Sequence, residues 1–432
     1  MKTKILAKIA MTVLLLALTL PAAASDYTLG IFGNANEDDT INMQDVTYTE
    51  LIILEYRDRT ELADGKHDGK INMQDVTQIE LVILGKEKEI TFIDAFEEAE
   101  TVNKPVERLA NIGNYGIQVA RAIDATDVLL PLCGSMVKRQ TVFFHEMSGW
   151  TCPSRSDGVD FEEILNFNPD AVQTNFESGS YVGREEQKRM YQRSLPGIPL
   201  ISLDFRTPAA HVRSVRMYGY ILDRREEAEE YLEWYQGYVD LFETITEDIS
   251  EDERPRFIVP GTDPYQIKVS TDRRAQSIEM SGGYNIADEI RPGEYTFKWS
   301  SFTVDPEWVV ENNPEYIFRV IHPGSVYPTG YETDDLSGVA TLRQEILDLP
   351  ELAEIDAVNN GNVYMIDGSI NDGGGNTIIA TAYCAKLFYP DLFEDIDPRE
   401  LHQEYVDRFC HIDFDVREHG AFVYPPLEEW AV

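Results

Sequence analysis

Residues 209–249 read AAHVRSVRMYGYILDRREEAEEYLEWYQGYVDLFETITEDI, and their apolar side chains recur at the spacing of a helix. Strand-like and helix-like stretches alternate on both sides of this segment, which is typical of βαβ units with parallel sheets. The sequence therefore predicts an α/β fold in which one long helix, residues 208–250, joins an N-lobe, residues 89–207, to a C-lobe, residues 254–432. The apolar positions of the helical pattern include Val212, Val215, Leu222, Tyr231, Trp234 and Leu241.

Short apolar runs mark the expected strands of both lobes. Each run holds three or four residues and is separated from the next by a polar or helix-like stretch. The expected strands are residues 129–132, 171–173, 200–203, 257–259, 317–320 and 363–366.

The composition is strongly acidic, with 77 Asp and Glu against 37 Lys and Arg and a formal net charge of −40. Counterion release requires basic residues on the contact face, so this charge argues against a nucleic-acid-binding protein. It also argues against docking on anionic lipid. The acidity is typical of adaptation to a salty exterior, since net charge governs solubility rather than fold.

The first 24 residues have the pattern of a secretory signal peptide. Lys2, Lys4 and Lys8 form a basic start, an apolar stretch covers residues 9–20, and Ala24 ends a small-residue cleavage site. The apolar stretch is shorter than the ~20 residues that span a bilayer. We expect a secreted, extracytoplasmic protein that is associated with the cell surface.

Four cysteines, Cys133, Cys152, Cys384 and Cys410, allow three disulfide connectivities in an exported protein. The pairs 133–152 and 384–410 each stay within one expected lobe. We expect these two disulfides, with buried free thiols as the alternative.

A heptapeptide, INMQDVT, occurs at residues 41–47 and again at residues 71–77. Each copy closes a loop whose oxygen-bearing residues stand at positions 1, 3, 5, 7, 9 and 12, as in a calcium loop. An apolar helix is expected after each loop, over residues 48–56 and 78–84. The predicted Ca²⁺ ligands are Asn34, Asn36, Asp38, the Thr40 carbonyl, Asn42 and Asp45 in the first loop, and Asp64, Asp68, the Lys70 carbonyl, Asn72 and Asp75 in the second.

The duplicated loop and helix, over residues 27–85, resembles a dockerin module. The resemblance implies a small all-α module that calcium folds and that binds a cohesin domain on a surface protein. Asn34 replaces the usual Asp and Lys66 offers no oxygen, so weak calcium binding is expected. The family reads its partner from positions 10 and 11, and Met-Gln stands there in both copies, which suits a two-fold, dual-mode binder.

Short motifs then follow one another to residue 393. They are KPVER at 104–108, DFEEIL at 160–165, NPDAV at 168–172, IEMSGGYN at 278–285, VDPEW at 304–308, NPEYI at 313–317, AVNNGNVY at 357–364 and LFYPDLF at 387–393. In this order and spacing they resemble the periplasmic binding proteins for iron–siderophores, haem and cobalamin, over residues 89–414. The resemblance implies two Rossmann-like lobes joined by a single long helix, with the ligand in the cleft between them. We expect a monomer that hands this ligand to an ABC permease.

In the resembled family one surface glutamate per lobe meets the permease, and the matching residues here are Glu162 and Glu307. Ordinary first-turn acids, favoured by the helix dipole, are the alternative. Ligands of open α/β folds lie beyond the carboxyl ends of the strands. The loops there supply the expected ligand-binding residues, namely Tyr115, Trp150, Arg155, Asn175, Tyr265, Lys298, Trp299, Arg319, His322 and Asn371.

The expected function is capture of an iron–siderophore, haem, cobalamin or similar metal chelate for an ABC importer, with a dockerin-like module for surface attachment. No catalytic residues and no catalytic cofactor are expected. Two alternatives remain open, a dockerin-bearing secreted polysaccharide hydrolase and a non-binding surface scaffold protein.

Overall fold

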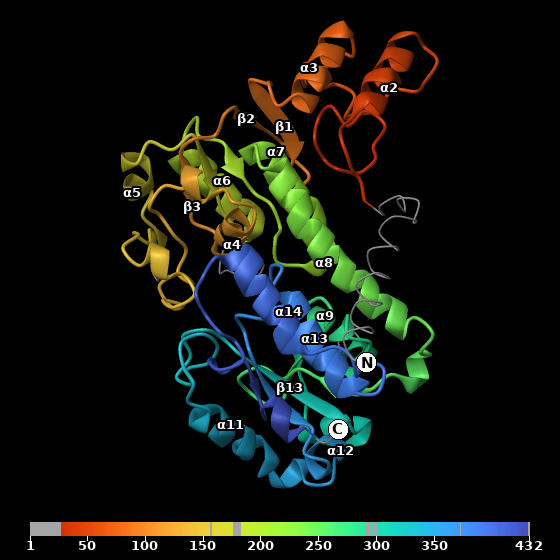
Figure 1. The fold of residues 1–432 in the computed structure, drawn as a ribbon, viewed down its shortest axis with the longest axis vertical. Helices are drawn as coiled ribbons and strands as arrows, with labels where there is room; N and C mark the ends of the chain where they lie inside the picture. Colours follow the sequence, from red (N-terminus) through yellow and green to blue (C-terminus); the bar gives the residue numbers. More distant parts are fainter. Residues whose placement is uncertain are drawn as a thin grey trace, which may run out of the picture. The chain divides into compact units, whose positions relative to one another are not determined.

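The computed structural model describes residues 27–155, 158–175, 183–290, 296–297, 300–371 and 373–430. The chain divides into two compact units, Met1–Ile93 and Asp94–Val432 (Figure 1). Strand β1 (Glu89–Ile93) belongs to the first unit. Within the described ranges, no helix is both long and apolar enough to cross a membrane. The expected signal peptide lies outside these ranges.

The first unit holds the two copies of the repeat. Its helices α2 (Met43–Ile53) and α3 (Met73–Ile83) begin inside the heptapeptides, earlier than the expected starts at residues 48 and 78. The reason is a capping box: Asn42 Oδ1 accepts from the Gln44 N–H at 2.7 Å, and Asp45 Oδ2 accepts from the Asn42 N–H at 2.8 Å. The second copy repeats both bonds at equivalent residues. The two copies therefore fold alike.

The N-lobe of the second unit contains a parallel sheet of three short strands in the order β3-β6-β7. Helices α4, α5 and α6 alternate with these strands, as the sequence predicted. The apolar core of this lobe draws on the three strands and on α5 and α6, and it includes Ala110, Ile164, Val172, Tyr191 and Leu200. The elements are β2 (Ala99–Asn103), β3 (Leu109–Asn111), α4 (Asn114–Ala122), η1 (Thr126–Val128), η2 (His145–Met147), β4 (Ser154–Arg155), β5 (Gly158–Val159), α5 (Phe161–Asn166), β6 (Ala171–Gln173), α6 (Arg184–Ser194) and β7 (Leu200–Ile201).

The prediction of a single helix over residues 208–250 is wrong, because the segment forms two helices, α7 (Pro208–Leu222) and α8 (Arg225–Thr246). Asp223 ends α7 in the left-handed region, with φ of 57°. The buried Lys104 amine holds this end by donating to the carbonyls of Tyr220 and Ile221 at 2.7 and 2.9 Å and by pairing with Asp223 at 2.7 Å. Three interactions from one cation therefore fix the break.

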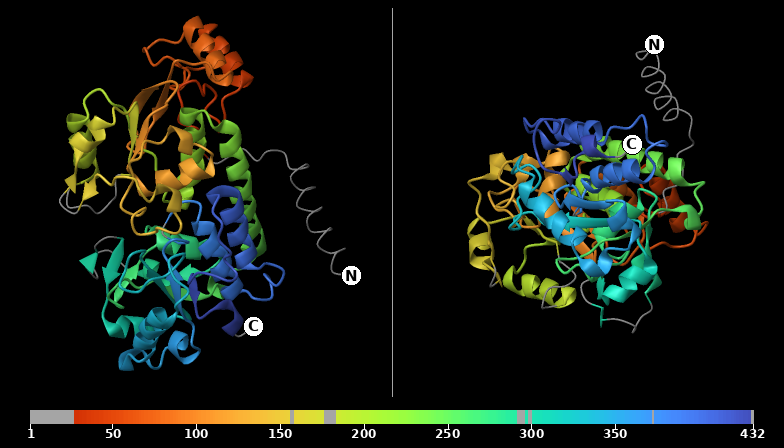
Figure 2. Two further views of the ribbon diagram at one scale, coloured as in Figure 1. Left: turned by 60° about the vertical axis from the view of Figure 1, so that its left-hand side comes forward. Right: turned by 90° about the horizontal axis from the view of Figure 1, so that it is seen from below.

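Helix α8 makes the connection that was predicted for the whole segment, and α7 also contacts α9 of the C-lobe. It packs against α4 of the N-lobe and against α13 of the C-lobe, and Figure 2 shows it running beside both lobes. Helix α7 folds back along α8, where a Cβ added to Gly219 would lie 2.7 Å from the Cβ of Ala228. The two lobes are thus joined by one 22-residue helix with a second helix packed against it.

The C-lobe contains a five-stranded sheet in the order β10-β8-β13-β14-β15, parallel except for its last strand. A separate antiparallel sheet, β11-β12-β9, lies in the same lobe. The elements are η3 (Glu251–Glu253), β8 (Arg256–Ile258), β9 (Gln266–Lys268), α9 (Arg273–Glu279), β10 (Tyr284–Asn285), η4 (Ile286–Glu289), β11 (Thr296–Phe297), β12 (Ser301–Thr303), α10 (Pro306–Asn312), β13 (Tyr316–Ile321), α11 (Ser337–Leu347), η5 (Pro350–Leu352), α12 (Asp356–Asn359), β14 (Val363–Asp367), α13 (Thr377–Phe388), α14 (Pro398–Tyr405), η6 (Val406–Cys410), β15 (Val423–Tyr424) and η7 (Leu427–Glu429).

Five of the six expected strands coincide with β6, β7, β8, β13 and β14 to within two residues at either end. The sixth, residues 129–132, does not form a strand. Leu129 and Leu132 instead make isolated parallel bridges to Leu109 and Thr151. This segment is therefore extended and paired at single points only.

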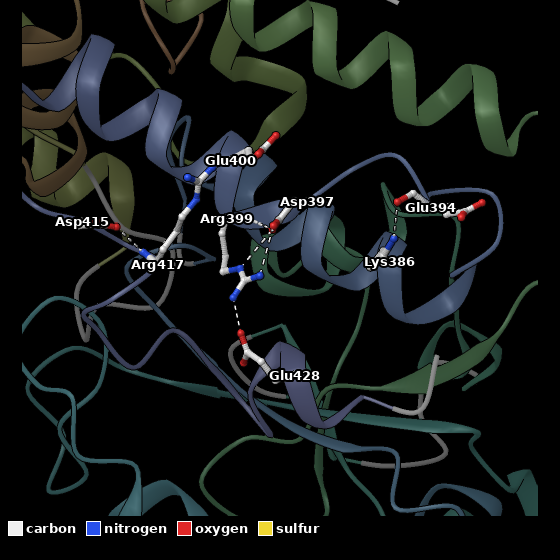
Figure 3. A network of polar contacts seen from close by, with 8 residues as sticks. All are labelled: Lys386, Glu394, Asp397, Arg399, Glu400, Asp415, Arg417 and Glu428. Atoms are coloured by element: carbon white, nitrogen blue, oxygen red, sulfur yellow. Dashed lines mark hydrogen bonds and ion pairs between the residues drawn. The ribbon is translucent and has the colours of Figure 1, made fainter. Parts of the chain in front are cut away.

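Several ion pairs connect residues near the C-terminal end of the C-lobe (Figure 3). Arg399 bonds to Asp397 and to Glu428, and Arg417 pairs with Glu400 at 3.0 Å. The Arg417 and Glu400 side chains are more than half exposed, so this pair contributes little to stability.

Candidate functional site

The faces of the two lobes that meet carry the carboxyl ends of the parallel strands. Arg273, at the start of α9, donates to the hydroxyl of Tyr115 in α4 at 3.2 Å. The Glu332 carboxylate of the C-lobe accepts from the Thr141 hydroxyl and the Val142 N–H of the N-lobe at 2.9 and 2.8 Å. The lobes therefore touch directly, and the residues around these contacts form the candidate ligand site.

On the N-lobe, strand β6 ends in two amides that point at helix α4. Gln173 is fully buried, and neither polar atom of its side chain has a hydrogen-bond partner. A Cβ added to Gly116 would lie 2.2 Å from Gln173 Oε1, so only glycine admits this approach. Asn175 donates to the Leu203 carbonyl at 3.3 Å while its own oxygen is buried and unbonded. Such unsatisfied buried amides retain capacity for a water or a ligand.

A small hollow lies at the ends of β6 and β7, with room for about one water molecule at 10 Å³. Its lining includes Thr174, Asn175, Ser202 and Arg206. A larger pocket of 270 Å³ adjoins it along α6. Three cations line that pocket, Arg184, Lys188 and Arg189. Lys188 is bonded to Asp94 and Glu98 at 2.5 and 2.6 Å, and Arg189 pairs with Glu186 at 3.1 Å.

On the C-lobe, four cations gather on β9, α9 and β13. We call Lys268, Arg273, Arg274 and Arg319 the cationic cluster. Lys268 is 7% exposed and pairs with Asp272 at 3.2 Å. Burial lowers the pKa of Lys268, and the charges of Arg274 and Arg273 lower it further against the opposing effect of Asp272. Burial, with Arg274 nearby, lowers the pKa of Arg319 to about 10. These cations therefore repel one another in a poorly solvated place, which an anion would relieve.

Four of the ten expected ligand-binding residues lie where the lobes meet or beside the cationic cluster: Tyr115, Asn175, Arg319 and Asn371. Tyr115 is buried beneath Arg273. Asn371 is also buried, donates to Ser277 Oγ at 2.6 Å and keeps an unbonded oxygen.

Three others lie elsewhere. The Tyr265 hydroxyl donates to Glu351 at 2.5 Å, and burial, with the charges of Glu351, Asp263 and Glu307, raises its pKa. His322 is exposed, with its ring bonded to the Pro323 carbonyl at 3.0 Å. Trp150 is half-buried in the loop before β4. The Arg155 side chain, Lys298 and Trp299 lie outside the described residues.

Sequence patterns did not predict Gln173, Arg206, Lys268, Arg273 and Arg274. The run Asp272-Arg273-Arg274 gave no distinguishing signal, because the same run of residue types occurs at Asp223-Arg224-Arg225 in the joining segment. Gln173 gave no signal, since its importance comes from burial against α4.

Glu162 and Glu307 occupy equivalent places in the two lobes. Each lies in the first turn of a short helix, α5 or α10, two residues after the Asp that precedes that helix. Both side chains are exposed, and the two helices lead into β6 and β13. The two lobes therefore repeat one acidic surface position.

The repeat loops of the first unit direct their acids inward. Asp45 and Asp75 are fully buried, and each accepts two backbone N–H bonds. Asn34 Oδ1 is buried without a partner. The Lys66 amine donates to Gln74 at 3.2 Å. Across the described ranges, no group of three or more His, Cys, Asp or Glu side chains is arranged to hold a metal ion.

The four cysteines are free thiols, so neither expected disulfide is present. Cys384 is buried within α13, and Cys410 is buried at the end of η6. Cys133 and Cys152 lie side by side and hydrogen-bond each other.

Three solved structures share the fold of this chain. MolA of Haemophilus influenzae, bound to molybdate, is 18% identical, with 75% of this chain and 98% of that chain covered at a TM-score of 0.59. The TroA-like protein FepB of Veillonella parvula is 19% identical, with 77% and 98% covered at 0.61. CeuE of Helicobacter pylori, with Ni(II) bound, is 17% identical, with 75% and 97% covered at 0.57. At these identities the likeness shows the fold alone.

Among curated proteins, no sequence matches this one. A family model named Peripla_BP_2, periplasmic binding protein, matches residues 154–370, which is half of the chain. The matched residues run from strand β4 through both joining helices to the loop after β14. Proteins of this kind are extracytoplasmic and deliver a small ligand to an ABC permease. Together with the two-lobed fold, this match shows that the chain belongs to the periplasmic binding protein family.

Proposed function

We propose that the second unit captures a small metal chelate, such as an iron–siderophore, haem or a cobalamin, and delivers it to an ABC permease, and that the anionic members of this set fit it best. The observation that carries this proposal is the cationic cluster. The chain has a net charge of −40, yet four cations gather on β9, α9 and β13 of the C-lobe, and one of them, Arg273, donates to Tyr115 of the N-lobe. Such a local concentration of charge attracts an anion that the rest of the molecule repels.

The N-lobe complements this charge with neutral groups. Gln173 and Asn175 have unbonded buried oxygens, and the charge of the nearby Arg206 is paired with Asp204 at 3.4 Å. A ligand held between the lobes would meet guanidinium groups on one side and amides on the other. Cations spread over β9, α9 and β13 fit an extended anion better than a single tetrahedral oxyanion.

A thermal-shift screen of the full chain tests this proposal. The probes are a ferric catecholate siderophore, a ferric hydroxamate siderophore, haem, cyanocobalamin and, as a small oxyanion, molybdate. We expect one of the chelates to raise the Tm, because a ligand that binds the folded state alone stabilises it by mass action. A rise in Tm with molybdate alone would contradict a metal chelate as the ligand, but would still indicate that the site binds an anion. If none of the probes raised the Tm, the proposal that the protein captures one of these ligands would be contradicted.

We also propose that Glu162 and Glu307 contact the permease. Their exposure and their equivalent positions in α5 and α10 support a role in which each lobe presents one carboxylate. An exposed carboxylate costs little to maintain and directs association with a basic partner.

For the first unit we propose a dockerin-like role, in which calcium occupies the repeat loops and the helices bind a cohesin-type domain. The buried Asp45 and Asp75 and the unbonded oxygen of Asn34 supply hard oxygen ligands of the kind that Ca²⁺ prefers. Asn36, Asp38 and the Thr40 carbonyl would complete the first loop, and Asp64, Asp68 and the Lys70 carbonyl the second. Bound calcium would neutralise the buried carboxylates and fix the loops.

The surface of the first unit supports the partner proposal. Met43 and Met73 are 59% and 56% exposed, and Leu54 and Leu84 are 62% and 63% exposed. Each pair occupies equivalent positions in the two copies. A duplicated apolar face of this kind offers a partner two equivalent ways to bind.

Calorimetry of the full chain with calcium or with a chelator tests the metal proposal. Calcium is expected to raise the unfolding temperature of the first unit, and Asp75→Asn, which alters the second loop, to reduce that shift. Asp58→Asn, on an exposed side chain of the same unit, is the control. An equal calcium effect in the Asp75→Asn protein and in the control would contradict the proposed loop sites.

For the partner, pull-down with a cohesin panel is expected to fail only for the double variant Met43→Lys with Met73→Lys. Loss of binding by either single variant would contradict two equivalent binding modes.

A further inference from the structure

Cys133 and Cys152 stand next to each other on two extended segments that run in the same direction. Leu132 and Thr151 form a parallel bridge, and the Cys133 N–H donates to the Thr151 carbonyl at 2.9 Å. Each cysteine is therefore one residue beyond a paired position, on the same side of the pairing. Neighbouring strands lie about 4.8 Å apart, within the Cα–Cα range of about 4.4–6.8 Å that a disulfide spans.

The two thiols differ in accessibility and in acidity. Cys133 is fully buried, whereas Cys152 is half-buried. The hydrogen bond with Cys133 lowers the pKa of Cys152 to about 6, with further help from the backbone of Ser154 and the charge of Lys138, while burial and Glu163 oppose it. The same hydrogen bond and burial raise the pKa of Cys133. Cys152 is thus the attacking thiolate and Cys133 the resolving thiol.

The segment between the two cysteines, residues 134–151, carries contacts from the N-lobe to the C-lobe. Thr141 and Val142 bond to Glu332, and the Arg139 side chain packs against Gly324, where an added Cβ would lie 2.7 Å from Arg139 Cδ. A covalent bond between residues 133 and 152 would close this segment into a loop at its base. The backbone of residues 134–151 would then have less conformational freedom.

We propose that Cys133 and Cys152 are a site of reversible oxidation whose disulfide braces the loop that contacts the C-lobe. The oxidant is a small-molecule or protein disulfide of the oxidising exterior. The Cys152 thiolate attacks one sulfur of this disulfide, forming a mixed disulfide and releasing one thiolate. The Cys133 thiol then loses its proton and attacks Cys152 Sγ, which forms the internal bond and releases the second thiolate. Two electrons and two protons leave the protein, and the external disulfide is reduced to two thiols.

Differential alkylation of the full chain tests the bond. The protein is incubated with oxidised glutathione, denatured in iodoacetamide, reduced and labelled with N-ethylmaleimide before peptide mass spectrometry. We expect the maleimide on Cys133 and Cys152 and the acetamide on Cys384 and Cys410. Acetamide on all four cysteines after oxidation would overturn the proposal, as would maleimide on Cys152 with acetamide on Cys133, which is the labelling that a persistent mixed disulfide with glutathione would give.

Amide hydrogen exchange tests the consequence for the loop. Reduction of the oxidised protein is expected to speed exchange at residues 134–151 by about tenfold and to lower the Tm by roughly 5 °C. Cys152→Ser, at the half-buried position, is expected to remove both responses, while Cys384→Ala is expected to keep them. An equal response to reductant in the wild type and in Cys152→Ser would overturn the bracing role.

Discussion

The two lobes share a βα plan but present different chemistry to each other. The N-lobe sheet has three strands of two or three residues, and its ends carry the neutral amides of Gln173 and Asn175. The C-lobe sheet has five strands, and the cationic cluster lies beside their ends. On the outer surface the lobes are alike, since each presents one exposed glutamate. If the proposed roles hold, permease recognition is duplicated between the lobes, whereas ligand recognition is divided between charge on the C-lobe and hydrogen bonding on the N-lobe.

The largest expected effect tests the duplicated feature. Glu162→Ala combined with Glu307→Ala is expected to reduce ligand uptake by at least about 100-fold, and each single variant by about tenfold, because each substitution removes one charge-assisted contact. Ligand affinity in solution should not change. Glu311→Ala, an exposed glutamate of the same α10 helix, is the control. Lower affinity in the double variant would mean that these carboxylates face the ligand instead.

A smaller effect is expected where the lobes differ. Arg319→Gln and Arg274→Gln are each expected to weaken binding of the ligand identified by the screen by about 10- to 100-fold, since each removes a charged hydrogen-bond donor. Asn175→Ala, on the neutral lobe, should weaken it by only about threefold. Titration calorimetry measures both. Arg417→Gln, the exposed cation of Figure 3, is the matched control. Equal losses from the two lobes would contradict a division of roles.

The lobes also differ in how pH acts on their stability. Burial lowers the pKa of His211, in α7, to about 4 from 6.5, and raises the pKa of Asp367, in β14, to about 6 from 3.8. His211 donates from Nδ1 to the Phe205 carbonyl and accepts from Tyr231, so the fold requires the neutral ring. Its contribution is present above pH 6.5 and is lost as the pH falls through 4. For Asp367 the fold favours the protonated acid, so stability falls as the pH rises from 3.8 through 6.

The two residues therefore oppose each other during acidification. Relative to wild type, His211→Gln should lose less stability between pH 6.5 and 4.5, and Asp367→Asn should lose more. Over its complete titration, each residue changes the free energy of unfolding by an amount on the order of 3 kcal/mol. Urea denaturation across this pH range measures the slopes, and other titrating groups cancel in the comparison with wild type. A His211→Gln slope that matches the wild type would show that His211 does not titrate in this window.

The sequence predicted those strands and helices whose positions follow from the spacing of apolar residues and from local motifs. Strands such as β13 and β14 are apolar runs bounded by polar residues, and the repeat predicted two equal helices. The break in the joining segment could not be read from periodicity, because apolar spacing continues on both sides of Asp223. Its cause is Lys104, more than a hundred residues earlier in the sequence. The cationic cluster was missed for a similar reason, since β9, α9 and β13 bring its members together only in three dimensions.

The smallest expected effect concerns this break. Asp223→Asn keeps a residue that tolerates the left-handed region but removes the ion pair with Lys104, and should cost about 1 kcal/mol of unfolding free energy. Asp223→Ala loses the same pair and adds a left-handed backbone cost of about 1 kcal/mol. In a continuous helix the order would reverse, because alanine is the better helix former by about 0.5 kcal/mol. Chemical denaturation of the two variants therefore distinguishes a broken helix from a continuous one, because the two cases predict opposite orders of unfolding free energy. An alanine variant more stable than the asparagine variant would mean that α7 and α8 are one helix in solution.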